Sequence, residues 1–130
     1  MRIGLSVYGT TFGMGIDLHS GRPTITPSQL MDKAIAVGLG GVDLPASLMQ
    51  GEDATAMARY AHERGLFITL ETEGHDPGKL ASTIDLSVRL GAGTVRTVVG
   101  GARLGGDRRP LAGPQSEFLT GETIVCWIGE

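Results

Sequence analysis

Cysteine, aromatic residues and long apolar runs are all scarce in this sequence, and each scarcity excludes something. Cys126 is the single cysteine among 130 residues, so no disulfide can form within the chain, and a reducing, cytoplasmic location is expected. No signal-peptide pattern follows Met1, and no apolar run reaches the length of a membrane span. Aromatic residues make up 5% and the formal net charge is −3, which argues against nucleic-acid and anionic-membrane partners.

Two nucleotide-binding motifs are also missing. No G-x-G-x-x-G follows the first strand-like segment, and no G-x-x-x-x-G-K-[ST] occurs anywhere in the chain. The sequence therefore gives no support to a dinucleotide-binding site or a P-loop.

The chain instead shows a repeated strand–helix pattern. The predicted strands are segments 2–9, 41–46, 66–73 and 94–100. Three helices separate them, with N-caps at Thr26, Asp53 and Asp76 and stops at Gly38, Gly65 and Gly91. In the first helix, the side chains expected to face inward are Leu30, Ala34 and Val37. In the second they are Met57, Ala58 and Ala61. The third helix runs through Leu80, Ile84 and Val88. This order predicts parallel strands joined by right-handed crossovers.

The strand count indicates a fold class. A complete (β/α)8 TIM barrel needs about 250 residues, and here four strands are used by Gly100. The prediction is an α/β fold in the form of a partial TIM barrel: three strand–helix units, a fourth strand and an irregular C-terminal tail. A small doubly wound α/β domain is the alternative.

Particular segments resemble a known family. "MRIGLSVYG", "AIAVGLGGVDLP", "IDLSVRLGAGTVRTVVGG" and "ARLGGDRRPLAG" are similar to the sugar phosphate isomerase/epimerase family of xylose isomerase-like TIM barrels. The resemblance covers roughly residues 1–119, as the N-terminal half of such a barrel. Residues 120–130 depart from it, and we interpret them as a divergent tail that is truncated or read in an altered frame, or alternatively as a fifth strand ending at Glu130.

The resemblance implies a function for the intact family enzyme. Such proteins isomerise or epimerise carbonyl sugars by metal-assisted proton transfer, and a divalent metal is held mostly by residues of strands five to eight. The expected partner is a small sugar or sugar phosphate, and this chain is expected to be an incomplete barrel without the full metal site. Two alternatives stay open: a non-catalytic half-barrel that forms homo-oligomers through its open strand edges, and an endonuclease-like relative acting on abasic DNA.

Candidate catalytic residues follow from the rule that a parallel barrel carries its site at the C-terminal ends of its strands. Glu71 and Glu73 lie at the end of the third strand with the same parity. Two such carboxylates could perform acid–base chemistry if burial raised one pKa. In the alternative interpretation, one is solvated at the rim and the other belongs to an ion pair.

Candidate substrate-binding residues lie in the neighbouring loops and strand ends. Tyr8 ends the first strand, Asp43 lies in the second, and His75 precedes the third helix. Asp43 could line the pocket or bond neighbouring backbone amides. Arg103 and Arg109 lie in the glycine-rich stretch after the fourth strand, where they could pair with a phosphate or carboxylate of the ligand. In the alternative, ion pairing within the loop neutralises the arginine charge. No residue is assigned as a metal ligand.

Overall fold

A computed structural model describes residues 2–7, 11, 13–16, 19–74, 76–98 and 124–127. Strands and helices alternate along these residues as the sequence predicts. In chain order they are β1 (Leu5–Ser6), α1 (Pro27–Ala36), β2 (Gly41–Pro45), the short 3₁₀ helix η1 (Ala46–Met49), α2 (Ala54–Glu63), β3 (Phe67–Glu73), α3 (Pro77–Leu90), β4 (Thr94–Val98) and β5 (Ile124–Trp127).

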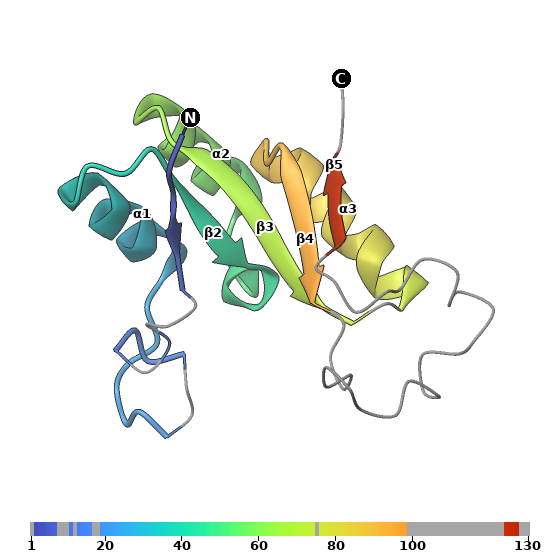
Figure 1. Ribbon diagram of the computed structural model, residues 1–130, viewed down its shortest axis with the longest axis horizontal. Coiled ribbons are helices and arrows are strands. Elements are labelled where there is room, and N and C mark those ends of the chain that lie inside the picture. Colours follow the sequence, from blue (N-terminus) through green and yellow to red (C-terminus); the bar gives the residue numbers. More distant parts are fainter. Residues whose placement is uncertain are drawn as a thin grey trace.

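The strands form one sheet in which spatial order follows chain order. The order is β1-β2-β3-β4-β5, and the pairs among β1 to β4 are parallel (Figure 1). The predicted α/β fold with a parallel sheet interleaved with helices is therefore confirmed. β5 runs the opposite way, with Thr94 facing Trp127 and Thr97 facing Ile124, so it does not extend the parallel series.

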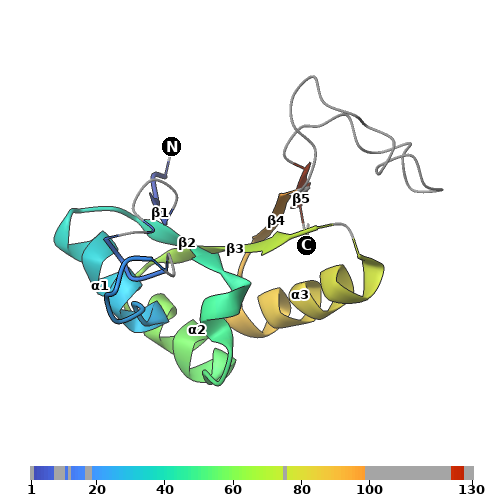
Figure 2. The ribbon, with the colours of Figure 1, turned by 90° about the horizontal axis from the view of Figure 1, so that it is seen from below.

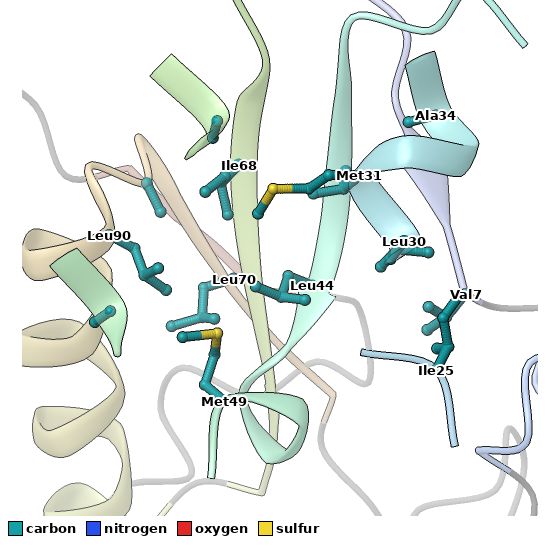
Figure 3. Packing of buried hydrophobic residues seen from close by; sticks show 14 residues of the cluster. Val7, Ile25, Leu30, Met31, Ala34, Leu44, Met49, Ile68, Leu70 and Leu90 are labelled. Atoms are coloured by element: carbon teal, nitrogen blue, oxygen red, sulfur yellow. The ribbon is translucent and has the colours of Figure 1, made fainter. Parts of the chain in front are cut away.

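The three α-helices all cover the same face of the sheet, as Figure 2 shows. Alternate strand residues point into this layer, and Val42, Leu44 and Leu70 are fully buried there. They pack with Leu30 and Met31 of α1 and with other members of one hydrophobic cluster (Figure 3). The residues between them point to the opposite face, which no described helix covers.

The helix ends follow the predicted capping. Thr26 forms a capping box with Gln29, and the carboxylates of Asp53 and Asp76 accept bonds from first-turn amides of α2 and α3. Gly91 closes α3 in a left-handed conformation with φ of 64°, which a residue with a Cβ adopts only at a cost. The strand–helix boundaries are thus encoded locally.

The inward face expected for the first helix needs correction. Val37 follows the end of α1 and is 66% exposed, so it does not complete the inward face of Leu30 and Ala34. In α3, Ile84 and Val88 are exposed, and the buried residues are Thr83, Ser87 and Leu90. Thr83 and Ser87 can be buried because their hydroxyl groups donate to carbonyl oxygens of the preceding turn.

The first strand is also shorter than predicted. β1 spans Leu5–Ser6 within the predicted segment 2–9, of which residues 8 and 9 lie outside the described residues. Before β1, the carbonyl oxygen of Ile3 accepts one hydrogen bond from the N–H of Gly40, the residue that precedes β2. Pairing with β2 therefore begins at Leu5, opposite Val42.

Candidate functional site

A charged cluster lies on the helix-free face of the sheet. Asp43 of β2, Glu71 of β3 and Arg96 of β4 point away from the core because each alternates with buried residues such as Val42, Leu70 and Val95. The three come from adjacent parallel strands, whose carboxyl ends meet at one edge. Parity and strand order together bring these side chains to one place.

Arg96 holds the cluster together. Its Nη2 atom donates to Asp43 Oδ2 and, at 3.0 Å, to Glu71 Oε2. Ser6 Oγ of β1 donates to the same Asp43 oxygen at 3.1 Å. The cluster therefore crosses all four parallel strands, and it contains two carboxylates for one guanidinium.

The register explains why an arginine is needed at position 96. Glu71 lies directly opposite Arg96, whereas Asp43 lies opposite Thr69, one strand further away and two residues back along β3. A side chain that reaches both must be long and must carry several donors, and a guanidinium supplies both properties. The contacts satisfy charges that are mostly removed from water: the side chains of Arg96, Asp43 and Glu71 are 21%, 16% and 6% exposed.

Burial affects the two carboxyl groups of the cluster differently. Oδ1 of Asp43 is buried and has no hydrogen-bond partner among the described residues. Burial raises the pKa of the Glu71 carboxyl, the nearby Arg96 opposes that rise, and the Glu73 carboxylate adds to it. Glu71 therefore holds its proton to a higher pH than an exposed glutamate.

A cleft of about 400 Å³ opens at the carboxyl edge of β2 and β3, between α3 and η1. Lys79 lines it from the first turn of α3, η1 with the following Gln50 forms the opposite wall, and residues 71–73 line it from the end of β3. These walls place the cleft on the helix-covered side of the sheet, whereas the side chains of Glu71 and Glu73 have the parity of the helix-free face. On that face Glu71 is buried in the cluster and Glu73 is exposed, so the two candidate catalytic carboxylates have different environments.

The structure describes three of the residues singled out from the sequence, namely Asp43, Glu71 and Glu73. Asp43 bonds the side chains of Ser6 and Arg96 on the helix-free face. Glu71 belongs to an ion pair while Glu73 is solvated, which is the geometry of the second interpretation of this pair. The other candidates, Tyr8, His75, Arg103 and Arg109, lie outside the described residues.

Two residues of the cluster were not predicted. Arg96 stands in the apolar segment "TVRTVV", and its parity matches that of Glu71 in "TLETE". A charge that alternates with buried residues in a strand signals a polar face, and this signal could have pointed to Arg96. Ser6 carries no comparable signal.

The cluster does not form a metal site. Within the part of the chain that the structure describes, no three His, Cys, Asp or Glu side chains are grouped so that they could hold an ion. Arg96 also occupies the position between Asp43 and Glu71 that a cation shared by these carboxylates would need. The cluster's own residues therefore do not fit the divalent metal that the family resemblance implies.

Comparison of the chain with protein-family models, with curated proteins and with solved structures finds no match. Among the described helices, none is both long and apolar enough to cross a membrane. The class defined by fold and site is thus an α/β protein that carries a charged cluster on the helix-free face of its sheet.

Proposed function

We propose that this chain is the N-terminal half of a TIM barrel of the sugar phosphate isomerase/epimerase type, acting on a carbonyl sugar or its phosphate. One observation carries the proposal: two carboxylates in contrasting environments, the buried Glu71 and the exposed Glu73, lie on the helix-free face at the carboxyl end of a parallel strand. The sheet is ordered as strands are ordered in a barrel, with all three α-helices on one face. In such barrels this edge carries the active site.

The contrast between the two carboxylates suits proton transfer next to a carbonyl. Glu73, which is exposed to solvent, takes the proton from the carbon beside the carbonyl, and the C–H electron pair forms the C=C bond of an enediol. Glu71, whose pKa is raised by burial, gives a proton to the carbonyl oxygen. For an isomer, Glu73 returns its proton to the former carbonyl carbon while Glu71 takes the hydroxyl proton of the neighbouring carbon, which becomes the new carbonyl. For an epimer, a solvent proton reaches the opposite face of the original carbon while Glu71 takes back the hydroxyl proton that it gave.

The experiment is proton exchange in heavy water. The full chain is incubated in ²H₂O with aldoses, ketoses and their phosphates, with and without Mg²⁺ or Mn²⁺, and loss of the ¹H signal beside the carbonyl is followed by NMR. Glu73→Gln should slow exchange by roughly a hundredfold or more, because it removes the base. Glu63→Gln, on the exposed surface of α2, is the matched control and should not. If no sugar exchanges in any condition, the proposal fails.

A second candidate function is self-association without catalysis. It is favoured by large apolar side chains that are exposed on the outer helices, namely Ile35 of α1 and Ile84 and Val88 of α3. β1 also leaves one sheet edge unpaired among the described residues. Light scattering across a range of protein concentrations tests this: a mass that rises with concentration supports it, and a constant monomer mass contradicts it.

A further inference from the structure

One nitrogen atom of Arg96 serves both carboxyl groups of the cluster. Nη2 of Arg96 donates to Oδ2 of Asp43 and, at 3.0 Å, to Oε2 of Glu71. A guanidinium group can instead give two parallel N–H groups to one carboxylate, which is its strongest ion-pair geometry. Glu71 lies directly opposite Arg96 in the register of β3 and β4, yet it receives a single bond from a nitrogen that it shares.

Asp43 is the residue that divides the guanidinium group. Its Oδ2 accepts from Arg96 Nη2 and also from Ser6 Oγ at 3.1 Å, so β4 and β1 hold this carboxylate from two sides. Its other oxygen, Oδ1, is buried and has no hydrogen-bond partner among the described residues. If the guanidinium turned wholly to Glu71, the Asp43 carboxylate would keep one neutral hydroxyl as its partner. A buried carboxylate paired in that way costs free energy, so Asp43 retains its bond to Arg96.

Glu71 has a second way to be accommodated, because a carboxyl group removed from water is stabilised by taking up a proton. Its side chain is 6% exposed, against 16% for Asp43, and burial raises the pKa of its carboxyl group. The charged side chains that face it are Arg96 of β4, Asp43 of β2 and Glu73 of its own strand. Lys79 lines the cleft on the other side of the sheet. Glu71 is therefore the carboxyl group of the cluster that does not depend on a full ion pair.

We propose that Asp43 is a positioning residue for Glu71: it holds the Arg96 guanidinium in the shared arrangement, which keeps Glu71 able to take up and release a proton. Without Asp43, the guanidinium would pair with Glu71 alone and hold it as a carboxylate. The proposal rests on the proposed function for the use of this proton on a sugar. It adds Asp43, which acts through Arg96, to the two carboxylates already assigned a role.

NMR of the full chain measures the protonation of Glu71 directly. The side-chain carboxyl carbons of glutamate are labelled with ¹³C, the Glu71 signal is assigned by its loss in Glu71→Gln, and its shift is followed as the pH is lowered. Asp43→Asn should move the midpoint of this titration to lower pH, because Arg96 can then give both nitrogens to Glu71. Asparagine has the shape of aspartate, and Arg96 keeps Glu71 as its counter-ion, so we expect this variant to fold. Asp85→Asn, on the exposed surface of α3, makes the same change of charge and should leave the midpoint unchanged.

A double-mutant cycle separates the position of Asp43 from its charge. Arg96→Lys keeps the positive charge but has no pair of parallel N–H groups to give to one carboxylate. In the Arg96→Lys background, Asp43→Asn should therefore shift the midpoint by about half as much as in the wild-type background, or less. An equal shift in both backgrounds would show that Asp43 acts only through its own negative charge, and it would overturn the proposal.

The possible results separate this proposal from the proposed function. In the exchange assay in heavy water, the rate for Asp43→Asn should begin to fall at a lower pH than for the wild type, because Glu71 gives up its proton earlier as the pH rises. A titration midpoint that is unchanged or raised in Asp43→Asn overturns the proposal, whether or not any sugar exchanges. A lowered midpoint without exchange of any sugar refutes the proposed function and leaves the positioning role of Asp43 standing.

Discussion

Replacing Arg96 with methionine should destabilise the fold by an amount that depends on pH. At neutral pH the variant leaves the carboxylates of Asp43 and Glu71 without their shared donor. Both now bond one nitrogen, so their oxygens lie within about 6 Å of each other. Removing one partner from a buried ion pair costs about 3–5 kcal/mol. Because Arg96 and Asp43 retain 21% and 16% exposure, we expect the lower end, about 3 kcal/mol.

The sign of the pH dependence follows from Glu71. Its pKa in the folded protein is already above the ordinary value of 4.5, so the folded state binds this proton more tightly than the unfolded state. The free energy of unfolding must then decrease as the pH rises from the unfolded-state pKa of Glu71 to its higher folded-state pKa. Loss of the Arg96 charge raises the folded-state pKa of Glu71 further and widens that interval. Relative to the wild type, the free energy of unfolding of Arg96→Met should therefore recover as the pH is lowered from neutral toward 4.5.

Urea unfolding followed by far-ultraviolet circular dichroism measures both effects. Arg59→Met, on the exposed surface of α2, makes the same chemical change away from the cluster and should cost little at either pH. A loss for Arg96→Met no larger than that of the control would refute the argument. So would a large loss that is the same at pH 5 and pH 7, because it would show that packing and not charge is responsible.

Three further substitutions test other parts of the structure by the same unfolding assay. Gly41→Ala should lower the free energy of unfolding by about 1–3 kcal/mol, because the new Cβ would lie 2.4 Å from the Phe67 carbonyl oxygen. Its control is Gly93→Ala, where a Cβ meets nothing within 4 Å, and this change should be near neutral. Equal effects of the two substitutions would contradict the steric argument. Asp76→Ala should cost about 1 kcal/mol through loss of the α3 cap, and an unchanged midpoint would argue against that cap. Glu71→Gln should flatten the decline of stability above pH 4.5 that the raised pKa of Glu71 causes; an unchanged slope would mean that another group is responsible.

The order and ends of the elements could be predicted from the sequence because their signals are local. Thr26, Asp53 and Asp76 cap their helices through residues two or three positions away, so a short window contains the whole interaction. The buried face of α3 could not be predicted in the same way. Ile84 and Val88 are apolar and exposed, while Thr83 and Ser87 are polar and buried, and only the position of the sheet determines which side of the helix faces inward.

The cluster could be predicted only in part, because its contacts depend on register. Asp43 and Glu71 could be selected as polar residues at strand ends, but the pairing of Glu71 with Arg96 requires the alignment of β3 with β4. The bond from Arg96 to Asp43 crosses a whole strand and joins residues 53 positions apart. The antiparallel direction of β5 also carried no sequence signal, since its composition suits a strand of either direction.

The burial of the cluster bears on what the helix-free face is for. A sheet face that stays in contact with water has no need of a buried arginine shared by two carboxylates, since each charge would be hydrated separately. Here Glu71 is only 6% exposed and Asp43 has an oxygen with no partner among the described residues, so the face already removes charges from water at a cost to stability. Buried charges that lower the stability of a fold are retained where they act on a bound molecule. The cluster holds Glu71 beside the exposed Glu73 on the helix-free face, and the proton transfer that we propose uses this difference in exposure.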